Sequence, residues 1–152
     1  EKISLLIIMS CAFCRNQEIK ERTVIENDLA FVFPTNIPIV PGHLLICPKR
    51  HVQYYEDVTQ EEKVAIESLR EKLKFALQKA FGAEGFNYAW NEEIIGGQSV
   101  PHFHLHIIPR KEGDTGIYQY EPREFLYRPG PRSVATSTEE LLEVISLIQK
   151  AL

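Results

Sequence analysis

The chain has 152 residues, which is the length of one typical domain, and its 17 Lys and Arg against 21 Asp and Glu give a formal net charge of −4. Hydrophobic residues make up 44% of the sequence and charged residues 25%, which are ordinary globular values and exclude a disordered or fibrous chain. The mild acidity argues against a general nucleic-acid coat, because such proteins are usually basic. We therefore expect one domain over residues 1–152 and no nucleic-acid partner.

The first residues of the chain are used to predict the cellular compartment of the protein. The apolar run from Ile3 to Met9 is too short to span a bilayer, and it has only Lys2 as a basic flank and no small-residue cleavage site. We expect a soluble, cytoplasmic protein with no membrane partner. Met9 is a candidate start, which would make residues 1–8 an upstream extension.

In chain order, the first predicted elements are strands, in which β-branched and aromatic residues are frequent. Asn27-Asp28 separates the first two strands, and this pair is typical of a hairpin turn. Pro109 is expected to end the last strand, because proline cannot donate to the ladder. The predicted strands cover residues 23–26, 29–33, 43–47, 86–90 and 103–108.

The clearest predicted helix covers residues 59–81, between the third and fourth strands. Thr59 and Glu62 form a capping box at its start, and Gly82 follows its end. Its apolar residues recur at spacings of three and four, which predicts one buried face. These residues are Ile66, Leu69, Leu73, Leu77 and Ala80.

The C-terminal part is predicted to differ from the rest. Residues 110–136 are rich in Gly, Pro, Tyr and Arg, and we expect an irregular tail segment there. A last helix is predicted over residues 138–152. Strands joined by hairpins, one long helix and a C-terminal helix together predict an α+β fold with an antiparallel sheet of about five strands.

Three of the five histidines fall within residues 102–106, in the pattern His-Phe-His-Leu-His. On a strand, alternate side chains share a face, so His102, His104 and His106 would project together from one rigid element. One interpretation is a plain polar face, and a second is a metal site, since imidazole binds zinc. A third is covalent catalysis on phosphorus, because imidazole is a competent nucleophile near neutral pH.

Two segments resemble a known family. Residues 97–108, Gly-Gln-Ser-Val-Pro-His-Phe-His-Leu-His-Ile-Ile, resemble the signature of the histidine triad family, in which three histidines alternate with hydrophobic residues. Residues 41–51, Pro-Gly-His-Leu-Leu-Ile-Cys-Pro-Lys-Arg-His, look like the other hallmark segment of that family. The resemblance covers roughly residues 9–110 and implies a compact antiparallel sheet with helices, usually in a homodimer whose sheets join.

Members of this family hydrolyse or transfer nucleoside monophosphates from phosphoanhydrides or phosphoramidates. By position, the resemblance implies that His104 is the nucleophile that forms a nucleotidyl-histidine at the α-phosphate, and that His106 and His43 orient it. The flanking residues look more like the fragile histidine triad and dinucleoside polyphosphate hydrolase branch than like the phosphoramidase branch. We therefore expect a nucleotide hydrolase or nucleotidyl transferase that acts on substrates like diadenosine tetraphosphate or on related AMP esters. The alternatives are a purine nucleoside phosphoramidase and a nucleotide-binding scaffold with little turnover.

The expected nucleotide site extends beyond the histidines. The resemblance places Gln98 and Ser99 at the phosphate and the leaving group, and Asn91 at a site amide. Thr35 stands where the family usually has an Asp or Asn that contacts the ribose, and Asn36 is a candidate substitute for it. Candidates for an apolar slot around the base, or equally for the core, are Phe13, Phe31, Phe33, Ile37 and Ile39.

Cys11 and Cys14 form a Cys-x-x-Cys pair, whereas Cys47 lies in an apolar run and is expected to be buried. By itself the pair is compatible with reduced thiols, with a redox pair or with half of a metal site. Histidine triad relatives that carry such a pair use four residues to hold zinc. The resemblance therefore implies that Cys11, Cys14, His51 and His102 hold a structural Zn²⁺.

Overall fold

The computed structural model describes residues 6, 10–114 and 136–152. Its antiparallel strands form one sheet: β1 (Ile25–Glu26), β2 (Ala30–Pro34), β3 (Leu44–Pro48), β4 (Gly85–Ala89) and β5 (Leu105–Arg110). Their order across the five-stranded sheet is β1-β2-β3-β5-β4, so β5 lies between β3 and β4 and β4 is an edge. Each strand begins within two residues of its predicted start, and the expected α+β fold is confirmed.

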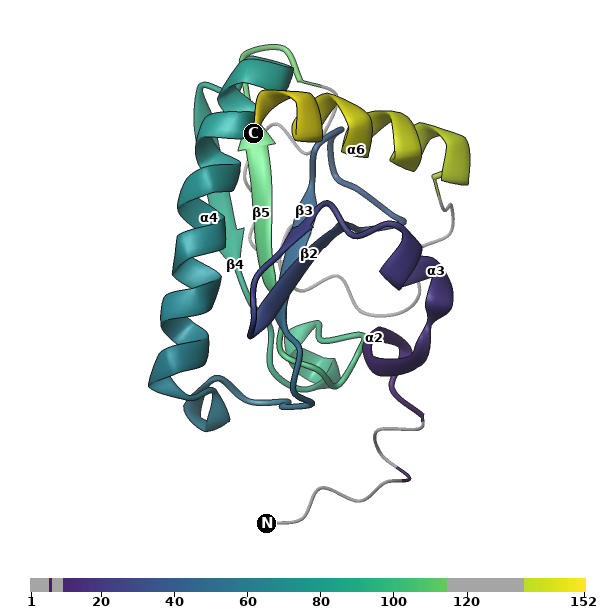
Figure 1. Cartoon of the computed structure of the whole chain (residues 1–152), viewed down its shortest axis with the longest axis vertical. Coiled ribbons are helices and arrows are strands. Elements are labelled where there is room, and N and C mark those ends of the chain that lie inside the picture. The colour runs from purple at the N-terminus through teal and green to yellow at the C-terminus, as the bar shows by residue number, and fades with distance from the viewer. Residues whose placement is uncertain (1–5, 7–9, 115–135) are drawn as a thin grey trace.

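The helical segments are α2 (Ala12–Arg15), α3 (Gln17–Glu21), the 3₁₀ turn η1 (Tyr55–Asp57), α4 (Gln60–Phe81), the 3₁₀ turn η2 (Ile94–Gly96) and α6 (Thr138–Ala151). The long helix α4 runs along the sheet, and α6 crosses near its end (Figure 1). The short helices α2 and α3 follow each other on the side of β2 away from α4 (Figure 1), and neither was predicted from the sequence. With four and five residues, they are too short to show a helical period.

The predicted signals at the ends of α4 and at the first hairpin are confirmed. The Thr59 hydroxyl accepts a hydrogen bond from the Glu62 N–H (3.1 Å), and the Glu62 carboxylate accepts one from the Thr59 N–H (3.0 Å). Gly82 ends the helix with a φ of +65°, a left-handed conformation that suits glycine. At the hairpin, the Asn27 side chain accepts hydrogen bonds from two backbone N–H groups at the start of β2.

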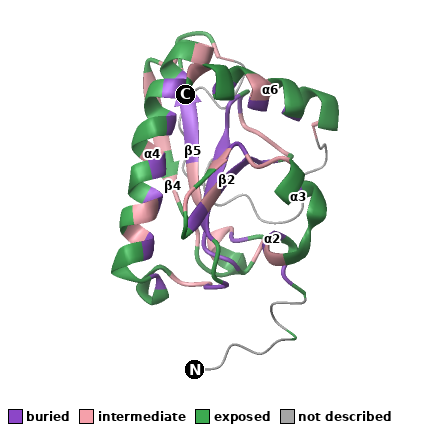
Figure 2. Ribbon diagram, viewed as in Figure 1, coloured by how far each residue is buried: buried purple, intermediate pink, exposed green. Residues whose placement is uncertain are grey.

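The sheet buries residues on both faces, because alternate residues of a strand point to opposite sides. On one face, β2, β3 and β5 pack against α4 and α6 through Val32, Leu44, Ile46, Ile107, Leu69, Leu73, Leu77, Ile145 and Ile148. On the other face, Phe33, Leu45 and Cys47 form a smaller cluster with Phe13 of α2 and Ile19 of α3. In Figure 2, β2 and β5 are largely buried, whereas α4 alternates between buried and exposed sides, as its amphipathic sequence predicts. The expected burial of Cys47 is confirmed, since it has 0% exposure.

Two expectations for the histidine strand are wrong. The strand β5 begins only at Leu105, so His102 and His104 precede it, and it continues through Pro109 to Arg110. Within the part of the chain that the structure describes, pairing of β3 with β5 covers residues 105–107, so β5 is paired there with β4 alone at Pro109. A proline is tolerated there because the strand is an edge on one side at that point.

The predicted tail segment of residues 110–136 lies mostly outside the described residues. Within the described part, Arg110 ends β5 and forms an ion pair with Asp114 (2.8 Å). The C-terminal helix is confirmed as α6, with the Ser137 hydroxyl accepting the Glu140 N–H at its start. Over the described residues, no helix is both long and apolar enough to cross a membrane.

Candidate functional site

His43 is positioned by a tight turn that leads into β3. Gly42 has a φ of +92°, and a Cβ at this position would lie 3.0 Å from Pro109 Cγ, so the turn requires glycine. The His43 N–H donates to the Val40 carbonyl (3.1 Å), which closes the turn. The His43 side chain is consequently buried between the turn and β5.

His43 and His106 form a chain of hydrogen bonds whose direction follows from the backbone. The Ile39 N–H donates to Nδ1 of His43 (3.1 Å). A neutral imidazole that accepts at Nδ1 carries its proton on Nε2, so Nε2 of His43 donates to Nδ1 of His106 (2.9 Å). The proton of a neutral His106 is then on its Nε2 as well. One backbone N–H thus sets the tautomers of two imidazoles in series.

His104 lies beside His106 and is also held in one tautomer. Its Nδ1 donates to the His102 carbonyl (2.7 Å), which places the lone pair on Nε2. The ring centroids of His104 and His106 are 5.0 Å apart, and Phe13 packs its ring edge-on against His104 at 5.1 Å. A buried imidazole with its lone pair on Nε2 can act as a nucleophile or as a base.

A second cluster brings Cys11, Cys14, His51 and His102 together, with all four ligand atoms within 4.8 Å of one another. Sγ of Cys14 is 3.3 Å from Nδ1 of His51 and 3.4 Å from Nδ1 of His102, and Sγ of Cys11 is 3.6 Å from Nδ1 of His102. The residues come from the start of α2, the loop after β3 and the segment before β5. Two thiols and two imidazoles are a donor set typical of closed tetrahedral zinc sites, so the cluster is capable of binding a metal ion.

The protonation states in this cluster also suit a metal. Nε2 of His102 donates to the Pro48 carbonyl (2.7 Å), so Nδ1, which faces both cysteines, carries the lone pair. Burial lowers the pKa of His102 to about 4, so the imidazole is neutral at pH 7, and burial also lowers the pKa of His51. Burial and the neighbouring Cys11 raise the pKa of Cys14 to about 12, which keeps a proton on the thiol until a cation displaces it.

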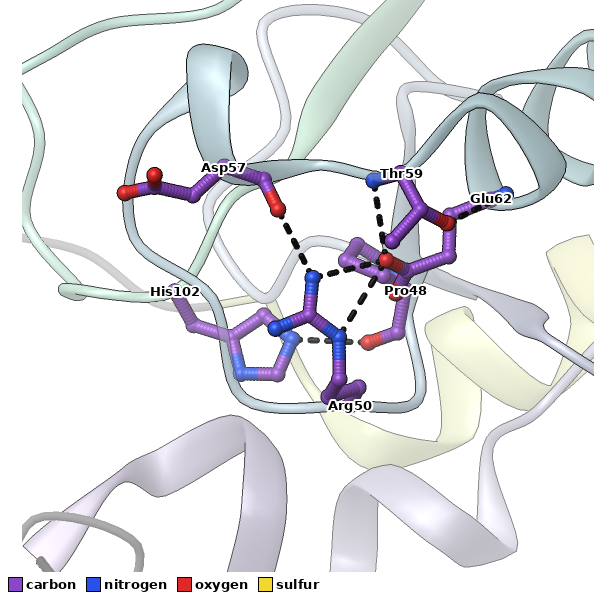
Figure 3. A network of polar contacts seen from close by, with 6 residues as sticks. All are labelled: Pro48, Arg50, Asp57, Thr59, Glu62 and His102. Atoms are coloured by element: carbon purple, nitrogen blue, oxygen red, sulfur yellow. Dashed lines mark hydrogen bonds and ion pairs between the residues drawn. The ribbon is translucent and has the colours of Figure 1, made fainter. Parts of the chain in front are cut away.

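A polar network supports the loop that carries His51 (Figure 3). The Arg50 guanidinium donates to Oε1 of Glu62 through Nη2 (2.7 Å) and Nε (3.2 Å), and to the Asp57 carbonyl (2.8 Å). Burial by itself raises the pKa of Glu62, but the hydrogen bonds from Arg50 and Thr59 outweigh it and hold this pKa below its usual value. The network therefore ties the loop after β3 to the first turn of α4.

The loop before β5 holds three of the predicted substrate residues. The Gln98 side chain is buried, and its Oε1 accepts the Glu93 N–H (3.2 Å) while its Nε2 donates to the Gln53 carbonyl (3.4 Å). The amide of Gln98 is thus engaged in holding the loop. Ser99 is exposed beside it, and Nδ2 of Asn91 donates to a carbonyl of the same loop (3.4 Å).

The two predicted ribose residues lie in the loop after β2. The Thr35 hydroxyl is buried and accepts the Ile37 N–H (3.3 Å). Asn36 has an exposed side chain, and its carbonyl accepts the Thr136 N–H (2.6 Å). Their contact with a ribose stays a prediction.

The residues expected to form a base slot divide between the core and a partly open surface. Phe13 and Phe33 are buried and pack edge to face with centroids 5.2 Å apart. Phe31 is half-buried and stacks on Phe33 at 5.6 Å. Ile37 and Ile39 are half-buried in the loop that leads to His43. The aromatic residues therefore line the sheet face that carries His104.

The groups that fix the tautomers were not found by sequence analysis. They are the Ile39 N–H and the carbonyls of Pro48 and His102. Every residue carries a carbonyl and nearly every residue an N–H, so no pattern of side chains could have identified them. The positive φ of +63° at Glu93 was likewise not predicted, because a glutamate gives no signal for this conformation.

Comparison with known proteins gives one consistent result. The HIT domain family matches residues 16–113. An uncharacterised HIT-like protein of Mycoplasma pneumoniae is 35% identical over 110 residues, which are 71% of this chain and 76% of that protein. The bis(5′-adenosyl)-triphosphatase of Dictyostelium discoideum is 31% identical over 123 residues, 81% of this chain and 83% of that protein. The crystal structure of a HIT-like protein from Bartonella henselae has a TM-score of 0.74 at 29% identity, over 94% of this chain and 96% of that one.

Proposed function

The chain belongs to the histidine triad (HIT) family, and we propose that it hydrolyses dinucleoside polyphosphates such as diadenosine tetraphosphate, or related AMP esters, at the α-phosphate. The observation that carries the proposal is the pair of hydrogen bonds that give His104 a lone pair on Nε2 and give His106 a proton on Nε2. These are the two complementary groups that displacement at phosphorus needs. The Dictyostelium relative, a bis(5′-adenosyl)-triphosphatase, supports the substrate class.

The proposed reaction has two steps. Nε2 of His104 attacks the α-phosphorus, an N–P bond forms, and the P–O bond to the leaving polyphosphate breaks. Nε2 of His106 donates a hydrogen bond to the leaving oxygen, which departs as an anionic polyphosphate, and the hydrogen bond from His43 to Nδ1 of His106 holds this donor in place. Water then attacks the phosphorus of the nucleotidyl-histidine, a P–O bond forms, and the N–P bond breaks, which frees Nε2 of His104 and AMP. The proton that the water loses passes to the solvent.

The test is a comparison of the wild-type protein with His104→Ala on diadenosine tetraphosphate labelled at an α-phosphate. We expect a labelled, acid-labile adduct on the wild-type protein and none on the variant, with turnover lower by about 1,000-fold or more. The thermal stability of both proteins serves as the control for folding. Normal turnover by His104→Ala would contradict the proposal.

Two alternatives give different results in the same assay. A purine nucleoside phosphoramidase would have a higher kcat/KM for an AMP–lysine phosphoramidate than for diadenosine tetraphosphate. A nucleotide-binding scaffold would bind AMP tightly yet turn over every substrate slowly. Parallel measurement of kcat/KM on both substrates therefore separates the three functions.

We also propose that the Cys11, Cys14, His51 and His102 cluster holds a structural Zn²⁺. The donor set fits, and four protein ligands leave no position for a reactive water, so the ion would stabilise the fold without entering the reaction. His102 connects the two sites, because its imidazole belongs to the cluster while its carbonyl accepts a hydrogen bond from Nδ1 of His104. A bound ion would thus fix the backbone that orients the nucleophile.

A homodimer is proposed from the edge of the sheet. Among the described residues, the strand β4 has a partner on one side only, and an edge of this kind is available for pairing with another strand. Tyr88 on β4 and Trp90 just after it are 40% and 44% exposed, and Phe75 on α4 is 64% exposed. Exposed aromatic side chains beside an open edge are typical of an interface, and a second copy would continue the sheet.

A further inference from the structure

A large cavity lies on the sheet face that carries α3, outside the reaction centre. Its volume is about 890 Å³, which is within the range of ligand pockets. It lies between α3, the hairpin of β1 and β2 and the loop after β3. Among the described residues that line it, none is His43, His104 or His106.

The charges at the cavity favour an anion. Lys20 of α3 and Lys49 of the loop after β3 both line it, together with one carboxylate among the described lining residues, that of Glu26. Lys49 and Glu26 form an ion pair of 3.4 Å, but their side chains are 40% and 60% exposed, so the pair is weak and open to exchange. The guanidinium of Arg50, which also lines the cavity, is already engaged by Glu62 (Figure 3). The remaining charge is positive, in a chain whose formal net charge is −4.

The rest of the lining favours a flat apolar group. Phe31 is half-buried and lines the cavity, and its ring is held in place by stacking on Phe33 at an angle of 19°. Ile25 continues the apolar surface on β1. An aromatic surface with ammonium groups beside it is suited to a base that carries a phosphate.

We propose that this cavity is a second nucleotide site, which binds a nucleoside monophosphate with its base on Phe31 and its phosphate between Lys20 and Lys49. The phosphate displaces Glu26 from Lys49. Phe13 lines the cavity and also packs against His104 at 5.1 Å, so an occupied cavity is in contact with the reaction centre through one side chain. The inference concerns binding and does not depend on turnover at His104.

The test measures AMP binding by equilibrium dialysis and calorimetry, with adenosine and inorganic phosphate as separate probes. We expect a class of AMP sites whose affinity falls roughly tenfold in a Lys20→Glu, Lys49→Glu double variant, because two attractive charges become repulsive. The Glu26→Gln variant should bind AMP more tightly at the same site, since it removes the competing carboxylate. Adenosine and phosphate should each bind more weakly than AMP, because each offers only half of the contacts.

The matched control is Lys74→Glu, a charge reversal on the exposed side of α4 away from the cavity. It should leave AMP binding unchanged. An AMP affinity that is unchanged in the Lys20→Glu, Lys49→Glu double variant would overturn the second site while leaving the proposed function intact. Conversely, a protein that fails to hydrolyse any dinucleotide but loses AMP binding in the double variant would support the second site and contradict the proposed function. If Lys74→Glu lowered the AMP affinity as much as the cavity variants do, the affinity would depend on the net charge of the protein and not on this cavity. That result would overturn the proposal.

Discussion

At the residue scale, the reaction centre depends on which nitrogen of each imidazole carries a proton. The Ile39 N–H and the His102 carbonyl are fixed by the backbone, so the imidazoles bonded to them have little freedom to exchange tautomers. His43 donates to Nδ1 of His106, and in the proposed reaction it acts through that residue. It is therefore a positioning residue.

Replacement of His43 tests this chain of hydrogen bonds. His43→Leu removes the donor to Nδ1 of His106, and we expect kcat to fall by about 100-fold with KM little changed. His43→Gln retains an acceptor for the Ile39 N–H and a donor for His106, so it should recover part of the loss. Steady-state kinetics over a range of pH checks both variants. A change in KM with kcat unaltered would contradict a role through His106. Equal activity of the Leu and Gln variants would contradict it as well.

At the element scale, the sheet and its turns hold these residues in place. The turn before β3 approaches β5 so closely that its glycine faces Pro109, Leu77 and Phe81. The loop after β3 is in turn tied to α4 by Arg50 and Glu62. The site therefore depends on contacts between elements that are distant in the sequence.

The Gly42→Ala variant tests the first of these contacts, with Gly82→Ala as its matched control. Both glycines have positive φ values, +92° and +65°, but a Cβ at Gly42 meets three side chains within 3.2 Å whereas one at Gly82 meets none of the described residues within 4 Å. We expect Gly82→Ala to cost about 1 kcal/mol and Gly42→Ala about 2–3 kcal/mol of the free energy of unfolding. Chemical denaturation measures both. Only Gly42→Ala should also lower kcat, and equal costs would show that the close approach is unimportant.

The Glu62→Gln variant tests the second contact through pH. The folded-state pKa of Glu62 is below its usual value near 4.5, so its ion pair stabilises the fold fully above that value and is lost as the pH falls through the lower, folded-state pKa. Because the Arg50 side chain is 45% exposed, we expect Glu62→Gln to cost only about 1 kcal/mol at pH 7. That difference from the wild-type protein should shrink as the pH is lowered below 4.5. Glu61→Gln on the exposed side of the same turn is the control, and a difference that is constant with pH would contradict the ion pair.

At the scale of the whole molecule, the metal cluster joins the N-terminal segment to the rest of the fold. Cys11 and Cys14 precede the sheet in the sequence, whereas His51 and His102 follow β3 and precede β5. A metal ion would therefore cross-link segments that are about 40 and 90 residues apart in the chain.

Metal analysis tests the proposed zinc site. We expect about one zinc per chain in the wild-type protein, none in a Cys11→Ser, Cys14→Ser double variant, and a clearly lower melting temperature for that variant. Chelation of the wild-type protein should lower the melting temperature to a similar extent. Cys47→Ala, which changes a buried cysteine outside the cluster, should keep its zinc. Carefully prepared wild-type protein without bound metal would overturn the site.

The proposed dimer is tested by sedimentation. The wild-type protein should sediment at twice the mass of one chain. Tyr88→Lys on the open edge of β4 should shift it toward the monomer, because a charge at a strand edge opposes pairing. Leu29→Lys, at the opposite end of the sheet near β1, is a matched change of an exposed apolar residue and should leave the mass unchanged. A wild-type protein that sediments as a monomer at all concentrations would contradict the homodimer.

Features that depend on neighbouring residues could be predicted from the amino-acid sequence. The capping box of Thr59 and Glu62, the helix end at Gly82 and the turn at Asn27 depend on neighbouring residues, so their signals lie within a few positions. Runs of β-branched and aromatic residues located the strands for the same reason. The resemblance to the histidine triad family added the residues expected to act together, including the four of the metal cluster.

The contacts between distant groups, and the tautomers that these contacts select, became known from the folded structure. It showed that His102 turns toward the cysteines while His104 and His106 adjoin, and that β5 continues through Pro109. It also placed backbone groups of Ile39 and Pro48 against the imidazoles. Such contacts join residues far apart in the chain and involve atoms common to nearly all residues. The pattern of side chains along the sequence therefore cannot predict them.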